Sequence, residues 1–191
     1  MHLAVAVRKL GRSKRNRRNF TKIGPTGVLA LSFAFSPVFP EDAVKSPPVK
    51  IAVFEFELED VSPAASLLDK TTSSTATMDE VSKQARRELA HSGRYSVIDV
   101  SKVDAKTVTG KSLRNCEGCE AGIALQLGAE QSLIGVVRRV TQTDYYVVIQ
   151  IRDARTGKLL DQQEANFAGS EEGWASGVRM LIKHQVLASQ N

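Results

Sequence analysis

Three apolar segments in the C-terminal half, separated by short polar turns, constrain the fold most. They span residues 131–140, 145–153 and 159–167, and each has the length of a β-strand. Residues 141–144 are a hairpin-length link, and residues 155–157 (Arg-Thr-Gly) form a second turn. Strands joined by links this short pair as antiparallel neighbours. The sequence therefore predicts a three-stranded antiparallel meander.

The first apolar segment of the predicted domain lies at residues 50–58 (KIAVFEFEL). It begins as a continuous apolar run and then alternates, which predicts a buried strand whose far end emerges into solvent. Strand alternation places Phe54 and Phe56 on one face of this strand and Glu55 and Glu57 on the other.

The segments between these strands have helical patterns. Thr77 and Glu80 form a predicted capping box, and Ser170 is a predicted cap of the last helix. The predicted elements, in chain order, are a helix over 77–92, a strand over 95–100, a short helix over 101–108, a helix over 115–127 and a final helix over 170–187. This order predicts an α/β (α+β) fold with one mixed sheet, an antiparallel C-terminal meander and helices packed on one face.

The N-terminal segment is basic and then apolar. Eight basic residues and no acidic residue lie in the first 22 positions, and an apolar stretch of roughly ten residues follows, too short to span a bilayer comfortably. This is the layout of a secretory signal peptide, and Arg17, Arg18 and Phe20 resemble the twin-arginine export motif. An uncleaved signal anchor and a basic tail from a misassigned start are the alternatives. We expect residues 1–45 to be an export signal with a Pro-rich linker, and residues 46–191 to be a single α/β domain.

The charge of the chain divides at the same boundary. The formal net charge is +5, but without the eight basic residues of the leader 18 basic residues face 21 acidic ones. A mildly acidic domain argues against nucleic acid as a partner. We expect a periplasmic or secreted protein that contacts a membrane only through the leader, if the leader stays uncleaved.

Cys116 and Cys119 are the two cysteines of the chain, spaced C-x-x-C at the start of a predicted helix. In an oxidising compartment such a pair can close a disulfide, and a helix N-terminus favours a thiolate. Glu117 and Glu120 oppose the thiolate by their charge. A structural disulfide, free thiols, redox exchange and metal or cofactor ligation all remain open. Two cysteines alone do not complete a tetrahedral zinc site, so we predict no metal and no cofactor.

Four acidic residues cluster where the first strand ends: Glu55, Glu57, Glu59 and Asp60. Ligands of α/β folds often bind beyond the carboxyl ends of strands, so this cluster is a candidate ligand rim for a cation or a general acid/base pair. The alternative interpretation is a solvated strand end.

A second candidate site combines two arginines with two tyrosines. Arg138 and Arg139 interrupt an apolar strand, and Tyr145 and Tyr146 lie in the next strand of the hairpin. Arginine and tyrosine are typical interface residues. Packing between neighbouring strands explains the same residues without an interface.

Several short segments, in order, resemble known families. Residues 50–56 (KIAVFEF), 93–99 (GRYSVID) and 127–137 (LGAEQSLIGVV) are similar to the α/β module shared by the TolB N-terminal domain and the curli-secretion protein CsgG. A family of secreted bacterial proteins of unknown function is a closer match, and its resemblance over residues 50–187 is carried by residues 115–120, 128–130, 136–151 and 170–174. The resemblance implies a TolB-N/CsgG-like fold and an exported location, but no activity. The chain has neither the acylated cysteine nor the pore-forming hairpins of CsgG, so a channel role does not carry over.

The sequence contains no phosphate-binding glycine loop and no nucleophile motif, so we predict that the protein is not an enzyme. The expected function is that of an exported periplasmic protein, a non-enzymatic binding or assembly-accessory module for another exported or envelope protein. One alternative is a thiol-active accessory protein that uses the C-x-x-C pair. Another is a small-ligand or cation binder at the acidic rim.

Overall fold

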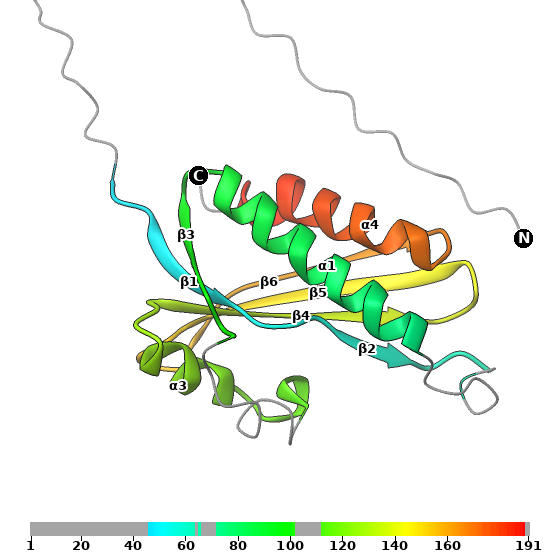
Figure 1. The fold of residues 1–191 in the computed structure, drawn as a ribbon, viewed down its shortest axis with the longest axis horizontal. Helices are drawn as coiled ribbons and strands as arrows, with labels where there is room; N and C mark the ends of the chain where they lie inside the picture. Colours follow the sequence, from blue (N-terminus) through cyan, green and yellow to red (C-terminus); the bar gives the residue numbers. More distant parts are fainter. Residues whose placement is uncertain (1–45, 64, 66–71, 102–111, 190–191) are drawn as a thin grey trace, which may run out of the picture. The chain divides into compact units, whose positions relative to one another are not determined.

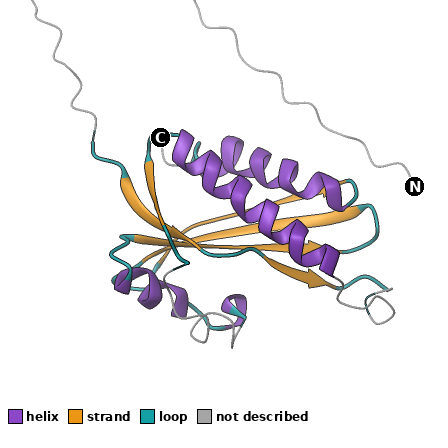
Figure 2. Cartoon of the chain, in the orientation of Figure 1, coloured by secondary structure: helices purple, strands orange, loops and turns teal. Residues whose placement is uncertain are grey.

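The computed structural model describes residues 46–63, 65, 72–101 and 112–189. In these residues, six strands form one mixed sheet with helices on both of its faces (Figures 1 and 2). The predicted fold class is therefore confirmed. The expectation that all helices share one face is wrong, because apolar side chains are buried on both faces of the sheet.

The sheet combines parallel and antiparallel pairs. Its strands are β1 (Val49–Val53), β2 (Glu57–Asp60), β3 (Tyr95–Ile98), β4 (Gln131–Arg139), β5 (Asp144–Asp153) and β6 (Leu159–Ala168). The order is β3-β1-β4-β5-β6, with β2 also paired to β4. Strand β1 is parallel to β3 and β4, whereas β4, β5 and β6 form the predicted antiparallel meander.

The helices differ from their predicted bounds. They are α1 (Thr72–His91), η1 (Leu113–Asn115), α3 (Cys119–Gln126), η2 (Glu171–Gly173), α4 (Trp174–Leu181) and the π-helical η3 (Ile182–Val186). Helix α1 starts before the predicted cap, so Glu80 lies inside it and pairs with Arg87 (Oε1 to Nη2, 2.5 Å). The last helix is divided into 3₁₀, α and π segments. The predicted helix over 101–108 lies, except for Ser101, outside the described residues.

The segment predicted as one strand over residues 50–58 is interrupted, because β1 and β2 pair with β4 in different registers. Val53 pairs with Leu133, and Glu57 pairs with Val136. Between these two pairs the chain advances by four residues in this segment but by only three in β4, so the segment contains one extra residue. One extra residue of this kind reverses the facing of all side chains beyond it. Phe54 and Phe56 accordingly lie in the two separate cores, so the prediction that they share a face is wrong.

Two residues stabilise this break. The N–H of Phe56 donates to Ser82 Oγ of α1 (2.8 Å), and Ser82 donates in turn to Met78 O (2.7 Å). On β4, a Cβ at Gly135 would lie only 2.1 Å from Phe56 Cε1. The phenylalanine ring therefore occupies the space that a side chain at Gly135 would need.

The sheet separates two apolar cores. The first core lies between the sheet and the helices α1, α4 and η3, and it contains Trp174, which is 2% exposed. The second and smaller core contains Ala52, Phe54, Leu113, Ile123, Ala124, Ala129, Ile134 and Ala154. It lies where α3 and η1 cover one end of the other face (Figure 1).

Candidate functional site

The four carboxylates predicted as a ligand rim point to both sides of the sheet, and each has a cationic partner. Glu55 Oε1 lies 2.7 Å from Arg86 Nη2 of α1. Glu57 is on the other face, where it accepts the N–H of Leu113 (2.6 Å) and so fastens η1 to β2. Glu57 also forms an ion pair with Arg114 of η1 (3.4 Å). The other two carboxylates of β2 pair with arginines of β4: Glu59 with Arg138 (2.6 Å) and Asp60 with Arg139 (3.2 Å). The geometry does not gather these groups around one shared cation.

Arg139 lies in the first core, where it is 8% exposed. Its guanidinium makes ion pairs with Asp60 and Glu171, and it stacks over the ring of Trp174 at 5.0 Å from the centroid. Burial acts to raise the pKa of Asp60, but the hydrogen bonds from Ser62 and the charge of Arg139 outweigh it, so the pKa is lowered. This arginine joins β2, β4 and the start of the last helix.

Tyr145 is opposite Arg139 in the β4–β5 ladder and is also buried, at 2% exposure. Its hydroxyl donates to Gly173 O (3.1 Å), and its ring stacks on Phe167 with centroids 5.6 Å apart. Burial raises the pKa of this phenol. Of the four predicted interface residues, Arg139 and Tyr145 therefore face the core, and Arg138 and Tyr146 face the other side of the sheet.

That other side has a region that no helix in the described residues covers. We call it the open face, and it is formed by alternate residues of the meander: Val136, Arg138, Tyr146, Val148, Gln150, Gln162, Glu164 and Asn166. The side chains from β6 and Arg138 are exposed, and the others are half-buried. A cavity of about 180 Å³ lies where η1 borders this face, lined by Glu59, Arg114, Asn115, Ile134, Val136, Arg138, Val148 and Gln150.

The charged groups at the cavity are held in fixed pairs. Arg138 Nε donates to Glu59 Oε2, and this hydrogen bond, with the charge of Glu59, raises the pKa of Arg138. Arg114 donates to Leu58 O (3.2 Å) beside its ion pair with Glu57. An apolar floor with a few oriented polar groups is typical of a binding site.

Strand β6 forms one edge of the sheet, beside the open face. Gly169 donates its N–H to Thr143 O (2.7 Å). Because hydrogen-bonded and non-hydrogen-bonded pairs alternate along an antiparallel ladder, this bond determines which residues of β6 are hydrogen-bonded to β5. The odd-numbered residues of β6 from 161 to 167 therefore direct their backbone groups to β5, and the even-numbered ones direct theirs outward. The outward residues are Gln162, Glu164, Asn166 and Ala168, and in the described part of the chain no strand pairs with them.

A disulfide joins Cys116 and Cys119, whose Cα atoms are 5.5 Å apart. Cys116 is half-buried at the end of η1, whereas Cys119 is exposed and is the first residue of α3. Between them, Glu117 (φ 51°) and Gly118 (φ 107°) have left-handed backbone conformations. Because the thiolate is the metal ligand, sulfurs bonded to each other do not serve as ligands.

A buried ion pair between Glu120 of α3 and Arg152 of β5 links the disulfide loop to the sheet. Glu120 is 1% exposed, and its Oε1 lies 3.1 Å from Arg152 Nε of β5. These two atoms make no aligned hydrogen bond, so charge holds the pair. Arg152 also donates to Gly157 O (3.2 Å). Sequence reasoning assigned Glu120 only a charge that opposes a thiolate, because its partner Arg152 lies far along the chain.

Sequence reasoning also missed the apolar part of the cavity. Val136 and Val148 alternate like any buried strand residues, and nothing local distinguishes a covered face from an open one. The export motif of Arg17, Arg18 and Phe20 lies outside the described residues. No helix in the described part of the chain combines the length and apolar character that a membrane span needs.

Comparisons with known proteins give one family and several similar folds. Residues 49–186 match the family DUF3280, described as a protein of unknown function (DUF2380). No curated protein matches the chain. Similar solved structures include the LpoB C-terminal domain from Salmonella enterica, at 17% identity and a TM-score of 0.44, covering 65% of this chain and 85% of that one. The lipoprotein GNA1162 from Neisseria meningitidis has 21% identity and a TM-score of 0.43, with 75% and 98% covered. TolB from Acinetobacter baumannii has 15% identity and a TM-score of 0.44, with 74% and 29% covered.

Proposed function

Since the chain belongs to DUF3280, a family of unknown function, we propose a role from its own surface: an exported, non-enzymatic module that binds an extended segment of another exported or envelope protein. The observation that carries this proposal is the outer edge of β6 beside the open face. A strand edge with unpaired N–H and C=O groups is a template for strand addition. The edge is regular over residues 161–168, because the one irregularity in the β5–β6 ladder lies at Ile151/Arg152.

The open face would contact the side chains of such a segment, in addition to the backbone contacts made by β6. A strand added to β6 places alternate side chains over the same side of the sheet as Gln162 and Glu164. From there, the face changes from the polar side chains of β6 to Val148 and the cavity on β4. Main-chain hydrogen bonds to β6 would provide affinity. The cavity, with Val136, Val148 and the ion-paired arginines, would select among bound segments by their side chains.

A non-enzymatic role fits the state of the ionisable groups. The carboxylates near the cavity are bound to Arg114 and Arg138. Both carboxylates therefore have structural partners in the described residues, and the role that we propose for this face is binding.

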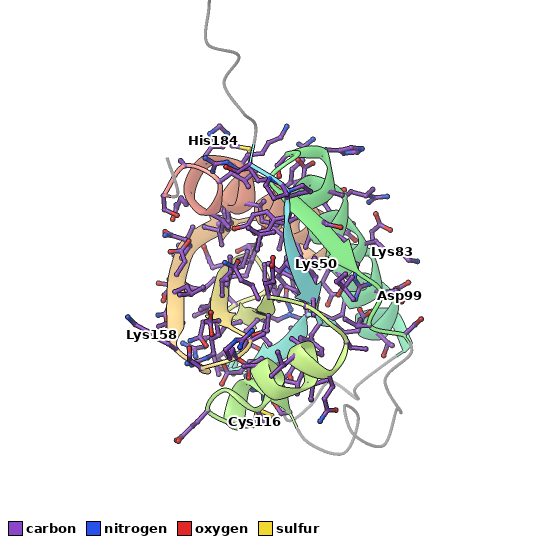
Figure 3. The ribbon with its side chains drawn as sticks, turned by 90° about the vertical axis from the view of Figure 1, so that its left-hand side faces the viewer. Lys50, Lys83, Asp99, Cys116, Lys158 and His184 are labelled. Atoms are coloured by element: carbon purple, nitrogen blue, oxygen red, sulfur yellow. A yellow bond between two sulfur atoms is a disulfide. The ribbon has the colours of Figure 1, made fainter. Side chains whose placement is uncertain are left out.

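Site-specific photo-cross-linking in the native host tests the binding surface. A photoreactive residue at Gln162 or Asn166 should cross-link to one partner protein. The matched control is Lys83, an exposed residue of α1 that lies on the opposite side of the view from Lys158, the residue directly before β6 (Figure 3). The proposal fails if the helix position captures the same partner as well, or if the β6 positions capture none.

Two substitutions at one residue then separate backbone from side chain. Glu164→Pro removes an outward N–H without touching the β5 ladder, and proline is tolerated at the free side of an edge strand. Glu164→Ala keeps the N–H. Loss of one or more backbone hydrogen bonds should weaken binding of the captured partner about tenfold in the proline variant and little in the alanine variant. Equal binding by both variants would contradict strand addition.

Export is the second part of the proposal, and the leader supports it. Replacing Arg17 and Arg18 together by lysine should leave the chain in the cytosol if the twin-arginine route carries it. Cell fractionation with mass measurement of the N-terminus reports both compartment and cleavage. An intact wild-type chain in the cytosol with both thiols reduced would overturn export.

A further inference from the structure

We propose that the Cys116–Cys119 disulfide is a thiol–disulfide exchange site, which an external dithiol attacks at Cys119 Sγ. The disulfide joins the end of η1 to the start of α3, near the lower end of the view in Figure 3, and it includes none of the outward residues of β6. It therefore does not depend on the binding role proposed above. Three observations carry the proposal: unequal access to the two sulfurs, the groups that surround Cys116, and the position of Cys119 in its helix.

The two cysteine residues differ in exposure. Cys119 is exposed, whereas Cys116 is half-buried between η1 and α3. Exchange requires an incoming thiolate to reach a disulfide sulfur, so accessible disulfides are the labile ones. Because Cys119 is the more exposed residue, we take its sulfur as the point of attack.

The surroundings of Cys116 favour a protonated thiol. Its Sγ lies 3.1 Å from Leu113 O and 3.6 Å from Glu120 Oε2. In the disulfide this sulfur has no proton, so neither acceptor receives a hydrogen bond from it. After reduction, the S–H can donate to one of them. Because Glu120 is buried, this new hydrogen bond stabilises the dithiol form and makes the disulfide easier to reduce.

Cys119 has the opposite preference. It is the first residue of α3, where the unpaired N–H groups and dipole of the helix favour a thiolate. Cys116 faces a carbonyl and a carboxylate, which disfavour an anion. The second cysteine of the motif is therefore the reactive thiolate, and the first is the protonated partner. Opening the loop also releases Glu117 from its left-handed conformation (φ 51°).

The exchange balances as follows. A thiolate of the dithiol attacks Cys119 Sγ, the S–S bond breaks, and its electron pair goes to Cys116 Sγ, which takes a proton. The second thiolate of the dithiol then attacks the mixed disulfide at the reagent's own sulfur and releases Cys119 as a thiolate. The protein gains two electrons and one proton, which solvent supplies to Cys116, and the dithiol becomes a disulfide.

The first test uses the wild-type chain. The folded protein is treated with glutathione, quenched with acid and mapped by mass spectrometry. Glutathione should be found on Cys119, with Cys116 as the free thiol. Glutathione on Cys116, or no adduct without denaturant, would overturn the proposal. Reduction by equal concentrations of dithiothreitol and reduced thioredoxin then identifies the source of the dithiol. Faster reduction by thioredoxin indicates a protein reductant, faster reduction by dithiothreitol a small molecule, and no reduction by either refutes exchange.

Single-cysteine variants measure the two thiols separately. Cys119 in Cys116→Ser should react with an aromatic disulfide reagent at neutral pH about three- to fourfold faster than Cys116 in Cys119→Ser. A thiol pKa that is one unit lower gives about tenfold more thiolate, but each thiolate is less nucleophilic. The difference should vanish in concentrated urea. Far-ultraviolet circular dichroism confirms that both variants are folded. Equal rates in the folded state would contradict the assignment of roles.

A charge change tests the part played by Glu120. In the Cys119→Ser background, Glu120→Gln should lower the pKa of the Cys116 thiol and increase its reaction rate. Glu117→Gln is the matched control, since it removes the same charge from an exposed position in the same loop. If both variants change the rate equally, Glu120 does not hold the proton on Cys116.

Discussion

Replacing Gly135 by alanine tests the packing that joins β4 to the break between β1 and β2. The new Cβ would lie 2.1, 2.3 and 2.5 Å from Cε1, Cζ and Cδ1 of Phe56. The ring has little room to retreat, because Phe56 is 3% exposed and its N–H is bound to Ser82. Overpacking a core typically costs about 1–3 kcal/mol. We expect a loss near the upper end of this range, because both the ring and its backbone are fixed.

Urea unfolding, followed by circular dichroism and by Trp174 fluorescence, measures this loss. A decrease of about 2–3 kcal/mol corresponds to a fall in Tm of roughly 5–10 °C for a domain of this size. Gly122→Ala is the matched control, because its Cβ in α3 would meet nothing within 4 Å. That variant should be as stable as wild type, or more stable by up to about 1 kcal/mol through helix propensity.

A double-mutant cycle decides whether the ring is the cause. Phe56→Leu removes the atoms nearest the new Cβ, so adding Gly135→Ala to this variant should cost little. The coupling between the two substitutions should be about 1–3 kcal/mol. Additive losses would show that Gly135 is required for a reason other than the Phe56 ring, and the proposed packing at the break would be refuted.

Three further predictions concern the first core. Arg139→Met should lower the free energy of unfolding by about 3 kcal/mol in urea, because it leaves Asp60 and Glu171 without their cation. The pKa of Asp60 is lower in the folded state than its unfolded value of 3.8, so this group stabilises the fold above that value and the stability is lost as pH falls through the folded pKa. The free energy of unfolding of Asp60→Asn should therefore fall less steeply than that of wild type below about pH 4. Tyr145→Phe removes the hydroxyl that donates to Gly173 O and should cost about 1 kcal/mol in thermal melts.

The meander was predictable because its signals are local. Alternation within each strand and two short turns determine both the pairing and its direction. The break between β1 and β2 was not predictable for the same reason. The apolar pattern of Phe54 and Phe56 fits an uninterrupted strand equally well, and the extra residue exists only relative to the register of β4, about 80 positions away in the chain.

The candidate sites divide in the same way. The spacing of Cys116 and Cys119 is local, and the sequence predicted both at the start of one helix. In the structure Cys119 begins α3, whereas Cys116 ends η1. The acidic and arginine clusters were treated as separate candidates. Parallel pairing of β2 with β4 makes them partners of each other, and this pairing is a long-range property. Adjacent residues such as Arg138 and Arg139 also take opposite faces, so a cluster in sequence is not a cluster in space.

The inserted residue at the break links the core to both proposed activities. Without it, strand alternation would keep Glu57 on the side of the sheet that faces α1. With it, Glu57 reaches the second face and fastens η1, which carries Arg114 and Asn115 to the cavity and ends at Cys116. The outward edge of β6 depends on the meander alone. Glu164→Pro should therefore weaken partner binding about tenfold and leave thiol exchange intact. Cys119→Ser should abolish exchange and leave binding intact, and a change in both activities in either variant would mean that the two surfaces are one site.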